Sequence, residues 1–534
     1  MIKISQIKVN IKHSREDLER EIRRYLKGKN TNFTYKILKK SIDARKGDLK
    51  FVYSVAVKMD QSIENKILKS RISNITRYND KKYEPEVMGQ NKMENRPVVI
   101  GYGPAGMFCT YLLSMYGYKP IVIERGENVE NRQLSIDDFF ENDKLDENSN
   151  VLFGEGGAGT FSDGKLNTLV KDKLGRNDFV LETFVKFGAD ESITYENKPH
   201  IGTDVLSVIV RNMREWAKKN GADFFFNTKM EDFTTRNGKI NKIITVNTKN
   251  GDKMEVECDN VILATGHSSR DTFEMIYNKK AIMEPKSFAM GIRIEHPREM
   301  IDKSQYGKYY KDLPAANYKL THKASNGRGV YSFCMCPGGY VVNSSSEKGR
   351  LCVNGMSYSG RNSDNSNSAI IVTVTKDDFP DNTPLGGIRL QRELEEKAYN
   401  EGQSHVPVQM YGDFKNNIAS KGMGEVQPLI KGKYTYGNLR NVLPEFMSNT
   451  IIEGVEEFAK RINGFNRLDA VVSGIEARTS SPLRIVRDED FQSNILGLYP
   501  CGEGAGYAGG ITSAAMDGMK VAEEIMRTYA PLTE

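Results

Sequence analysis

The sequence predicts an α/β fold, in which a Rossmann-like nucleotide-binding domain carries an inserted α+β domain and follows an N-terminal ferredoxin-like α+β module. A glycine-rich turn at residues 101–106 follows a short apolar strand and opens a helix. A second glycine-rich turn between a strand and a helix lies at residues 502–511. Between Gly266 and Gly474 the pattern changes to alternating apolar runs, which favour an inserted sheet.

Length and composition indicate a folded chain of several domains. The 534 residues exceed the usual domain size of ~100–200 residues. An apolar share of 38% with 27% charged residues is typical of folded chains. Six cysteines without a regular framework favour a reducing compartment. The uncharged residues 97–118 contain glycines that suit a strand, a turn and a buried helix, and no signal-peptide core follows Met1, so we expect a cytoplasmic protein without a membrane partner.

Residues 1–78 are predicted as a separate ferredoxin-like α+β module, and the polar residues 79–96 as a linker. The predicted strands lie at 7–11, 33–37 and 51–57, and the predicted helices at 18–26 and 63–68. A polar turn at residues 43–48 separates the second and third strands. This β-α-β-β-α order is typical of a ferredoxin-like unit.

The basic charge of the chain is concentrated in its N-terminal part. Residues 1–96 carry 24 Lys and Arg against 12 Asp and Glu, a net charge of +12, whereas the remaining residues carry 52 against 58, a net charge of −6. This asymmetry is typical of a module that binds nucleic acid or an acidic protein. Phe51 and Tyr53 alternate along a predicted strand. They could be the base-stacking aromatics of an RNA-binding sheet, or they could belong to the core. The simpler interpretation, a solvated basic surface, is preferred.

The first glycine-rich turn has the pattern G-x-G-x-x-G in a β-α-β context. Gly101 permits the tight turn, Gly103 lets the backbone approach a pyrophosphate, and Gly106 lets the helix pack closely on the strand. Pro104 and Ala105 open the helix, whose free N–H groups and partial positive charge suit phosphates. The turn therefore predicts a bound dinucleotide.

Glu124 ends the second strand at the position where an acidic side chain meets a ribose. Its carboxylate can accept hydrogen bonds from ribose hydroxyls and would repel a 2′-phosphate, so an NADP-type ligand fits poorly here. Arg125, the next residue, is expected at the same part of the ligand.

The second glycine-rich turn predicts FAD rather than NAD. It resembles the closing motif of the glutathione-reductase-like flavoproteins with two dinucleotide-binding domains. The resemblance implies that Gly502 and Glu503 meet the ribityl chain, although Asp is commoner than Glu there. The helix that begins near Gly510 and Ile511 would direct its positive end at the N1–C2 carbonyl region of the flavin and stabilise the anion left by hydride uptake.

A third motif supports the same cofactor. Residues 261–267 resemble the A-T-G strand end that passes under the FAD phosphates in this group, through Thr265 and Gly266. Residues 222–228 are predicted as a strand whose end, near Met230, lies beside the adenine. Only one G-x-G-x-x-G stands in a β-α-β context, so a nicotinamide donor would have to bind transiently at the flavin face.

Four further strings resemble a family of uncharacterised bacterial FAD-dependent dehydrogenases, which plant plastid proteins also resemble. The strings are FGEGGAGTFSDGKL at 153–166, ATGHSSRD at 264–271, FCMCPGG at 333–339 and EARTSSP at 476–482. The resemblance covers most of the chain, including the basic N-terminal module, and implies FAD binding and redox activity without a substrate. More distantly, the flavin core resembles tRNA-modifying flavoproteins and fumarate-reductase-like dehydrogenases.

The loop at residues 154–165 holds five glycines and is expected to wrap the flavin. The polar residues at its end, Ser162, Asp163 and Lys165, either face a substrate or are solvated parts of a packing loop. The cofactor contacts expected from this loop are Gly157, Gly159 and Thr160.

The candidates for the chemistry are Cys334, Cys336, His267 and Arg478. A C-x-C pair beside a flavin could pass two electrons as a dithiol, but the short ring would be strained, so packed or substrate-lining cysteines are preferred. His267 could donate a proton or cap the strand end, and His200 is a second acid/base candidate. Arg478 could bind an anionic substrate or, as we favour, the flavin ring. We expect no metal site, because further ligands are lacking.

The predicted FAD-binding domain therefore comprises residues 97–266 and 474–534, with the inserted substrate domain at 267–473. The first hypothesis is an FAD-dependent oxidoreductase that moves hydride between an unidentified substrate or electron donor and flavin N5. The second is a flavin-dependent RNA-modifying protein whose basic module binds RNA. The third is a non-catalytic flavin sensor whose partners dock on that module.

Overall fold

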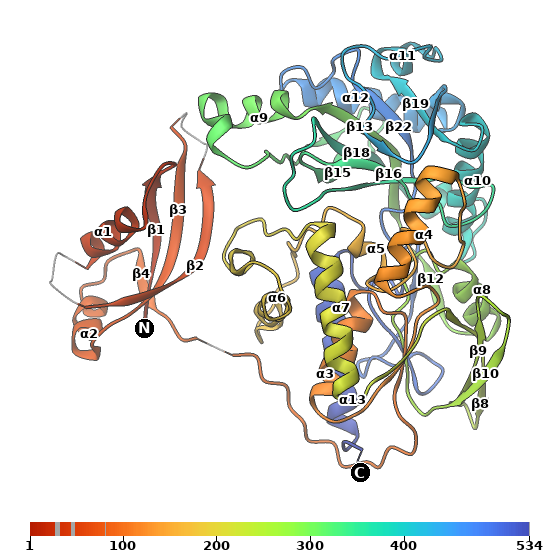
Figure 1. Ribbon diagram of the computed structural model, residues 1–534, viewed down its shortest axis with the longest axis horizontal. Coiled ribbons are helices and arrows are strands. Elements are labelled where there is room, and N and C mark those ends of the chain that lie inside the picture. The colour runs from red at the N-terminus through yellow and green to blue at the C-terminus, as the bar shows by residue number, and fades with distance from the viewer. Residues whose placement is uncertain (27–31, 44–47, 81, 533–534) are drawn as a thin grey trace.

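Figure 1 shows the computed structural model, in which three parts are visible: an N-terminal module on the left, a nucleotide-binding domain at the lower right, and a cap domain above it. The structure describes residues 1–26, 32–43, 48–80 and 82–532. The turn predicted at residues 43–48 includes 44–47, which lie outside these ranges. Within the described ranges, no helix is long and apolar enough to cross a membrane.

The N-terminal module is an antiparallel sheet with helices packed against it. Its elements are β1 (Ile2–Asn10), α1 (Arg15–Tyr25), β2 (Thr34–Asp43), β3 (Lys50–Lys58), α2 (Gln61–Lys69) and β4 (Ile75–Arg77). The strand order is β2-β3-β1-β4, so the first and third strands are central. Helix α1 begins at a capping box, in which Ser14 and Asp17 each accept a backbone hydrogen bond from the other.

The aromatic pair on β3 does not form an open stacking surface. Tyr53 is 4% exposed, and its hydroxyl lies 3.0 Å from Nε2 of His13. Phe51 is half-buried, with the ammonium of Lys40 4.8 Å from the centre of its ring. Because a base-stacking platform needs exposed ring faces, Tyr53 belongs to the module core, the alternative that the sequence left open.

The nucleotide-binding domain is built on a parallel sheet with the order β24-β11-β5-β6-β7. Its strands are β5 (Val98–Ile100), β6 (Ile121–Ile123), β7 (Asp223–Phe225), β11 (Val261–Leu263) and β24 (Leu498–Pro500). Its helices are α3 (Pro104–Met115), α4 (Val129–Asn142), α5 (Gly157–Thr160), α6 (Arg176–Lys186), α7 (Thr203–Lys219), α8 (Arg270–Asn278) and α13 (Ile511–Thr528), with the short helix η1 (Glu191–Thr194). Helices α3, α7 and α13 share one apolar core on one face of this sheet.

A smaller antiparallel sheet follows β7. Its strands are β8 (Thr228–Arg236), β9 (Lys239–Asn247) and β10 (Lys253–Glu257), in the order β10-β9-β8. The prediction of one strand at 222–228 is wrong at its end, because Asn227 takes a left-handed conformation with φ of 51° and divides β7 from β8. Met230 therefore lies in β8.

The cap domain is a mainly antiparallel sheet with the order β14-β15-β18-β13-β22-β19-β21. The elements from residue 283 to 378 are β12 (Met283–Pro285), β13 (Phe288–Pro297), α9 (Arg298–Tyr306), η2 (Gly307–Asp312), β14 (Thr321–Lys323), β15 (Gly329–Cys336), β16 (Tyr340–Asn343), β17 (Val353–Met356), β18 (Asn365–Val374) and η3 (Lys376–Asp378). Those from 386 to 485 are α10 (Gly386–Glu401), β19 (Val406–Met410), α11 (Tyr411–Asn416), β20 (Ile430–Lys431), β21 (Tyr434–Tyr436), η4 (Leu439–Asn441), α12 (Glu445–Ala459), β22 (Val471–Glu476) and β23 (Leu483–Ile485).

The structure does not divide the two domains at the predicted boundary between residues 473 and 474. Strand β22 runs through that position and pairs with β13 and β19 in the cap sheet. At the other border, Phe273 and Ile276 of α8 pack into the core of the nucleotide-binding domain. A strand ladder and a shared core, rather than a change in composition, therefore set the borders.

Residues 83–91 of the predicted linker are docked along α13. Tyr83 donates a hydrogen bond to Glu523 at 2.6 Å, and the amide of Gly89 donates to the carbonyl of Met526 at 3.0 Å. Asn91 pairs with Tyr529 beyond the helix end. In Figure 1 this segment runs below the nucleotide-binding domain to the C-terminal end of α13.

Candidate functional site

A cavity of about 1360 Å³, including its open mouth, lies between the nucleotide-binding domain and the cap domain. Its walls come from the carboxyl ends of β5, β6 and β11, the first turns of α3 and α13, and the cap strands β15, β17 and β22. Ligands of open parallel sheets bind beyond the carboxyl ends of the strands. The cavity therefore lies where a dinucleotide binds in folds of this kind, along the turn before α3 and the start of α13.

The glycine-rich turn after β5 forms one wall of this cavity. Gly101 has a φ of 92°, and a Cβ there would lie 2.9 Å from the carbonyl oxygen of Ala264. Gly103 faces Gly157, where a Cβ would lie 3.0 Å from the Cα of Gly103. No described side chain caps α3, which begins at this turn. Bare backbone and an uncapped helix start are the features that a diphosphate needs.

Three of the predicted cofactor residues do not line the cavity but lie behind its wall: Gly106, Gly502 and Thr160. A Cβ at Gly106 would overlap the carbonyl oxygen of Gly101, and one at Gly502 would lie 2.7 Å from the Cβ of Ala105. Both glycines therefore allow the close packing of α3 that brings its start to the cavity. Thr160 is buried, and its hydroxyl has no hydrogen-bond partner among the described residues.

Glu124 lies at the end of β6 and faces the cavity. Its Oε2 accepts a hydrogen bond from the amide of Tyr102 at 2.8 Å, and its Oε1 accepts from Gly126 at 3.0 Å and from Gly154 at 3.1 Å. A carboxylate offers about four lone-pair sites. One site therefore remains for a ribose hydroxyl.

Beyond Glu124 the cavity is lined by Arg125, Phe153 and Met230. The guanidinium of Arg125 lies 4.4 Å from the ring centre of Phe153, and it pairs with Asp271 at 2.8 Å. Met230 lines this cavity from β8. Such a surface suits an adenine ring.

The turn after β11 brings Thr265, Gly266 and His267 to the cavity. His267 is 7% exposed, and neither of its ring nitrogens has a hydrogen-bond partner in the described part of the chain. Its nearest charged neighbour is Glu503, with 3.6 Å between Nδ1 and Oε1. Because buried polar atoms are almost always paired, a ligand in the cavity is the natural partner of this ring.

The first turn of α13 closes the opposite end. Gly510 is the N-cap residue, and no side chain of the described residues caps the helix. Gly510, Ile511 and Glu503 all line the cavity. The close-approach glycines, two uncapped helix starts and the unpaired buried atoms together fit a flavin adenine dinucleotide.

Strand β15 ends irregularly, and this separates the two cysteines of the C-x-C pair. Its register breaks between Phe333 and Cys336, and Cys334 takes a left-handed φ of 40°. Cys334 is exposed to the cavity, whereas Cys336 is buried and its thiol donates to the carbonyl of Cys334 at 3.2 Å. Burial raises the pKa of Cys336 to about 12. The geometry favours one substrate-lining and one packed cysteine over a dithiol pair.

A buried ion pair supports the cap side of the cavity. Arg293 is fully buried and donates to Glu476 at 2.9 and 3.2 Å. It also donates to Asn367 at 2.5 Å and to the carbonyl of Cys334 at 3.2 Å. Nothing in the sequence singled out Arg293, because its partners come from β15, β18 and β22.

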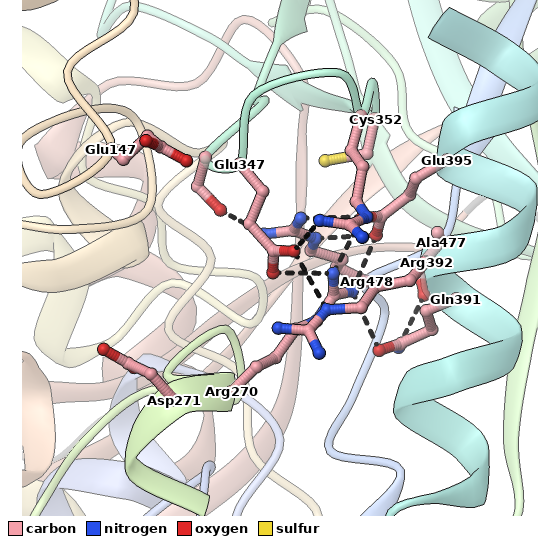
Figure 2. Close-up of polar contacts among 12 residues, drawn as sticks. Glu147, Arg270, Asp271, Glu347, Cys352, Gln391, Arg392, Glu395, Ala477 and Arg478 are labelled. Carbon is pink, nitrogen blue, oxygen red and sulfur yellow. Dashed lines mark hydrogen bonds and ion pairs between the residues drawn. The ribbon is translucent and has the colours of Figure 1, made fainter. Parts of the chain in front are cut away.

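Arg478 lines the cavity, but its hydrogen bonds go into the protein. Its Nε and one terminal nitrogen bind Glu395 at 2.8 Å each, and the other terminal nitrogen binds Ser346. Arg270 binds the same carboxylate at 2.7 and 2.9 Å, and Figure 2 shows both guanidinium groups converging on Glu395. Arg478 therefore contributes charge at the wall, and its contact with the flavin ring or an anion stays a prediction.

Among the remaining candidates, Ser162 lines the cavity, and Asp163, Lys165 and His200 lie beside it. Three cap residues that line the cavity were not expected: Asn354, Glu476 and Thr479. The motif EARTSSP at 476–482 contains Glu476 and Thr479, so it could have indicated these two residues. In the described ranges, no group of three or more His, Cys, Asp or Glu side chains could hold a metal.

The fold and the cavity define a flavin dinucleotide-binding protein, and family models match each part of it. Residues 95–284 match the model described as pyridine nucleotide-disulphide oxidoreductase, residues 287–479 the model described as FAD-dependent protein, C-terminal domain-like, and residues 1–58 a domain of unknown function. An uncharacterized protein of Clostridium beijerinckii is 45% identical over 538 residues, which cover 99% of both chains. The chain belongs to this family of FAD-dependent oxidoreductases, and its cofactor is FAD.

Two solved flavoprotein structures are similar at low identity. The glycerol-3-phosphate dehydrogenase from Bacillus halodurans, complexed with FAD, matches with a TM-score of 0.36 and 12% identity, over 81% of this chain and 64% of that chain. Glycine oxidase from Bacillus cereus matches with a TM-score of 0.35 and 11% identity, over 81% of this chain and 95% of that chain. The nucleotide-binding domain is a Rossmann-like α/β domain that binds FAD.

Proposed function

We propose that the protein is an enzyme, an FAD-dependent dehydrogenase that moves hydride between a small substrate and flavin N5. The observation that carries this proposal is the polar cap wall of the FAD cavity, which Cys334, Asn354 and Glu476 line, with Glu476 paired to Arg293 behind the wall. A wall with a thiol, an amide and a carboxylate suits a reacting substrate.

We assign FAD to the residues that the motifs and the cavity share, supported by neighbours that close the wall. The proposed site consists of Gly101, Gly103, Pro104, Ala105, Gly106, Glu124, Arg125, Gly157, Gly159, Thr160, Met230, Thr265, Gly266, Gly502, Glu503, Gly510 and Ile511. The start of α3 would hold the diphosphate, Glu124 a ribose, and the start of α13 the flavin.

Bound FAD supplies the hydride chemistry, and the chain supplies position and charge. The positive end of α13 favours negative charge at the flavin end of the cavity. The cap domain covers that end and limits access of water. Cys334 keeps a proton at neutral pH, because desolvation in the deep cavity raises the pKa of its thiol.

We also propose domain limits. The N-terminal module at 1–78 is a ferredoxin-like unit, supported by its strand order. Residues 79–96 connect it to an FAD-binding domain at about 97–266 and 474–534, with a substrate domain at about 267–473. Within these limits α8 belongs to the FAD-binding domain and the whole of β22 to the substrate domain.

Anaerobic reduction of the FAD-loaded protein tests the enzyme proposal. A panel of metabolites, with NADH and NADPH, is added singly, and the visible absorbance of the flavin is followed. We expect at least one donor to bleach it at a saturable rate. If dithionite bleaches the flavin and no donor does, the dehydrogenase proposal is wrong.

A further inference from the structure

A buried carboxylate and several cationic side chains meet beside the flavin end of the cavity. The carboxylate is Asp163, which is 3% exposed, at the end of the glycine-rich loop. The cations are Lys165 from the same loop, Lys198 from the segment before α7, and Arg361 from the segment between β17 and β18. Two separate domains therefore build this cluster.

Two of the cations share one oxygen of Asp163. Arg361 binds Oδ2 at 2.7 Å, and Lys165 binds the same oxygen at 3.2 Å. The other oxygen accepts a hydrogen bond from Ser357, whose hydroxyl lies 3.4 Å from Nε2 of His200. Burial would raise the pKa of Asp163, but Lys165 and Arg361 outweigh it and hold that pKa below its ordinary value.

The cluster adjoins the cavity rather than the distant surface. Lys165 donates a hydrogen bond to the carbonyl of Met335, the residue next to the cavity-lining Cys334. Desolvation raises the pKa of the Cys334 thiol, and Lys165 is close enough to act against that rise. Ser162, in the same loop, lines the cavity directly. The side chain of Lys165 is 35% exposed, so a ligand can reach it.

Positive charge exceeds negative charge in this cluster. Lys165 and Arg361 pair with Asp163, and Lys198 lies near Lys165 and donates a hydrogen bond to Asn317. One further carboxylate, Asp204, accepts hydrogen bonds from Ser359. The Nε of Arg361 is buried without a partner among the described residues. An ammonium has three donors, and two of those on Lys165 are used, by Met335 and Asp163. Donors and charge are thus left for an anion.

The pKa of the neighbouring His200 is affected by the charges of this cluster. Burial first, and then the charge of Arg361, lower the pKa of His200 to about 4, although Asp163 acts against them. Burial and then Lys165 also lower the pKa of Lys198. At neutral pH His200 is therefore uncharged, and it can orient a ligand by hydrogen bonding without adding to the charge.

We propose that this cluster is the substrate-binding site and that the substrate carries a carboxylate, bound by Lys165 and Arg361. The inference rests on the proposed oxidoreductase function and names its substrate class. A planar guanidinium matches a carboxylate by paired hydrogen bonds, and an ammonium adds a point charge. With its carboxylate held there, the rest of a small substrate extends past Cys334 toward the flavin.

Anion titration of the oxidised, FAD-loaded protein tests the site without needing turnover. The probes are acetate, oxalate, succinate, fumarate and benzoate, with inorganic phosphate as the non-carboxylate arm. Binding is followed by the visible flavin spectrum and by calorimetry. We expect saturable binding of at least one carboxylate, and Lys165→Met and Arg361→Met to weaken it about 10–100-fold each.

Matched variants separate the site from general charge and from folding. Lys348→Met removes the same charge from a side chain that is 78% exposed and 3.9 Å from Glu147, and it should leave the affinity unchanged. Arg361→Lys keeps the charge without the planar fork and should retain part of the affinity. FAD content and thermal unfolding of each variant show that it has folded.

The results separate the proposed carboxylate site from the proposed dehydrogenase function. If no carboxylate binds, if only phosphate binds, or if the Lys165 and Arg361 variants bind as the wild type does, the carboxylate site is wrong. If carboxylates bind and the variants lose them while no donor reduces the flavin, the site stands and the proposed dehydrogenase function fails.

Discussion

Replacing Glu395 with glutamine tests how far a buried ion network stabilises the junction of the two large domains. Glu395 on α10 is fully buried and accepts four hydrogen bonds of 2.7–2.9 Å from Arg270 and Arg478 (Figure 2). Removing one partner of a buried ion pair costs about 3–5 kcal/mol, because the remaining charge stays buried. Two guanidinium groups would be left here, so we expect the upper half of that range.

The loss should depend on pH. Burial would raise the pKa of Glu395, but Arg270 and Arg478 outweigh it and hold that pKa well below its ordinary value. A carboxylate of this kind contributes stability that is fully present above its unfolded pKa of about 4.3 and is lost as the pH falls through the folded value. The difference between wild type and Glu395→Gln should therefore be largest near neutral pH and shrink below about pH 4.

Thermal unfolding of the FAD-loaded protein, followed by circular dichroism, measures the effect. At about 2.1 cal/mol/K per residue, a chain of 534 residues unfolds with an entropy of about 1.1 kcal/mol/K, so Glu395→Gln should lower the Tm by roughly 4 °C. Glu393→Gln is the matched control on the same helix, because its pair with Lys397 is about half exposed and such pairs contribute about 0–1 kcal/mol. A Tm for Glu395→Gln within 2 °C of that control would refute the reasoning.

Three further outcomes are expected. Gly106→Ala places a Cβ against the backbone of the turn before α3 and should abolish FAD retention in gel filtration, whereas Gly422→Ala, with open space around it, should retain the flavin. Tyr83→Phe removes the hydrogen bond to Glu523, at a cost of about 1–2 kcal/mol, and should speed proteolysis within residues 79–96 without loss of FAD. Cys334→Ser should change the rate of flavin reduction by a donor at unchanged flavin content, and an unaltered rate would remove this residue from the substrate wall.

The cofactor and the first βαβ unit could be predicted because their signals are local. Gly101 and Gly103 are required by a single turn that spans only six residues. Glu124 follows at the spacing expected of one βαβ unit. The start of α13 at Ile511 was likewise marked by the glycines before it. In each case a short segment of backbone meets the ligand, so its composition carries the information.

The polar network of the cap domain could not be predicted, because its partners are distant in sequence. Arg293 meets Glu476 across a ladder between β13 and β22, and Arg270 meets Glu395 across the junction of α8 and α10. A charged residue on a strand or helix ordinarily predicts a solvated face. Only the tertiary structure shows that these charges are buried and paired.

The position of β24 and α13 also bears on how this protein is made. Strand β24 pairs with β11, and α13 packs against α3, although both follow β11 by most of the cap domain in sequence. Ribosomes add about 5–20 residues per second. After β11 is synthesised, β24 and α13 therefore follow on the order of 10–50 s later, and until then the edge of β11 and the apolar face of α3 have no partner. During that interval the nascent chain presents an open sheet edge to chaperones and proteases. Because the proposed flavin site includes Gly510 and Ile511, flavin binding there should follow this closure.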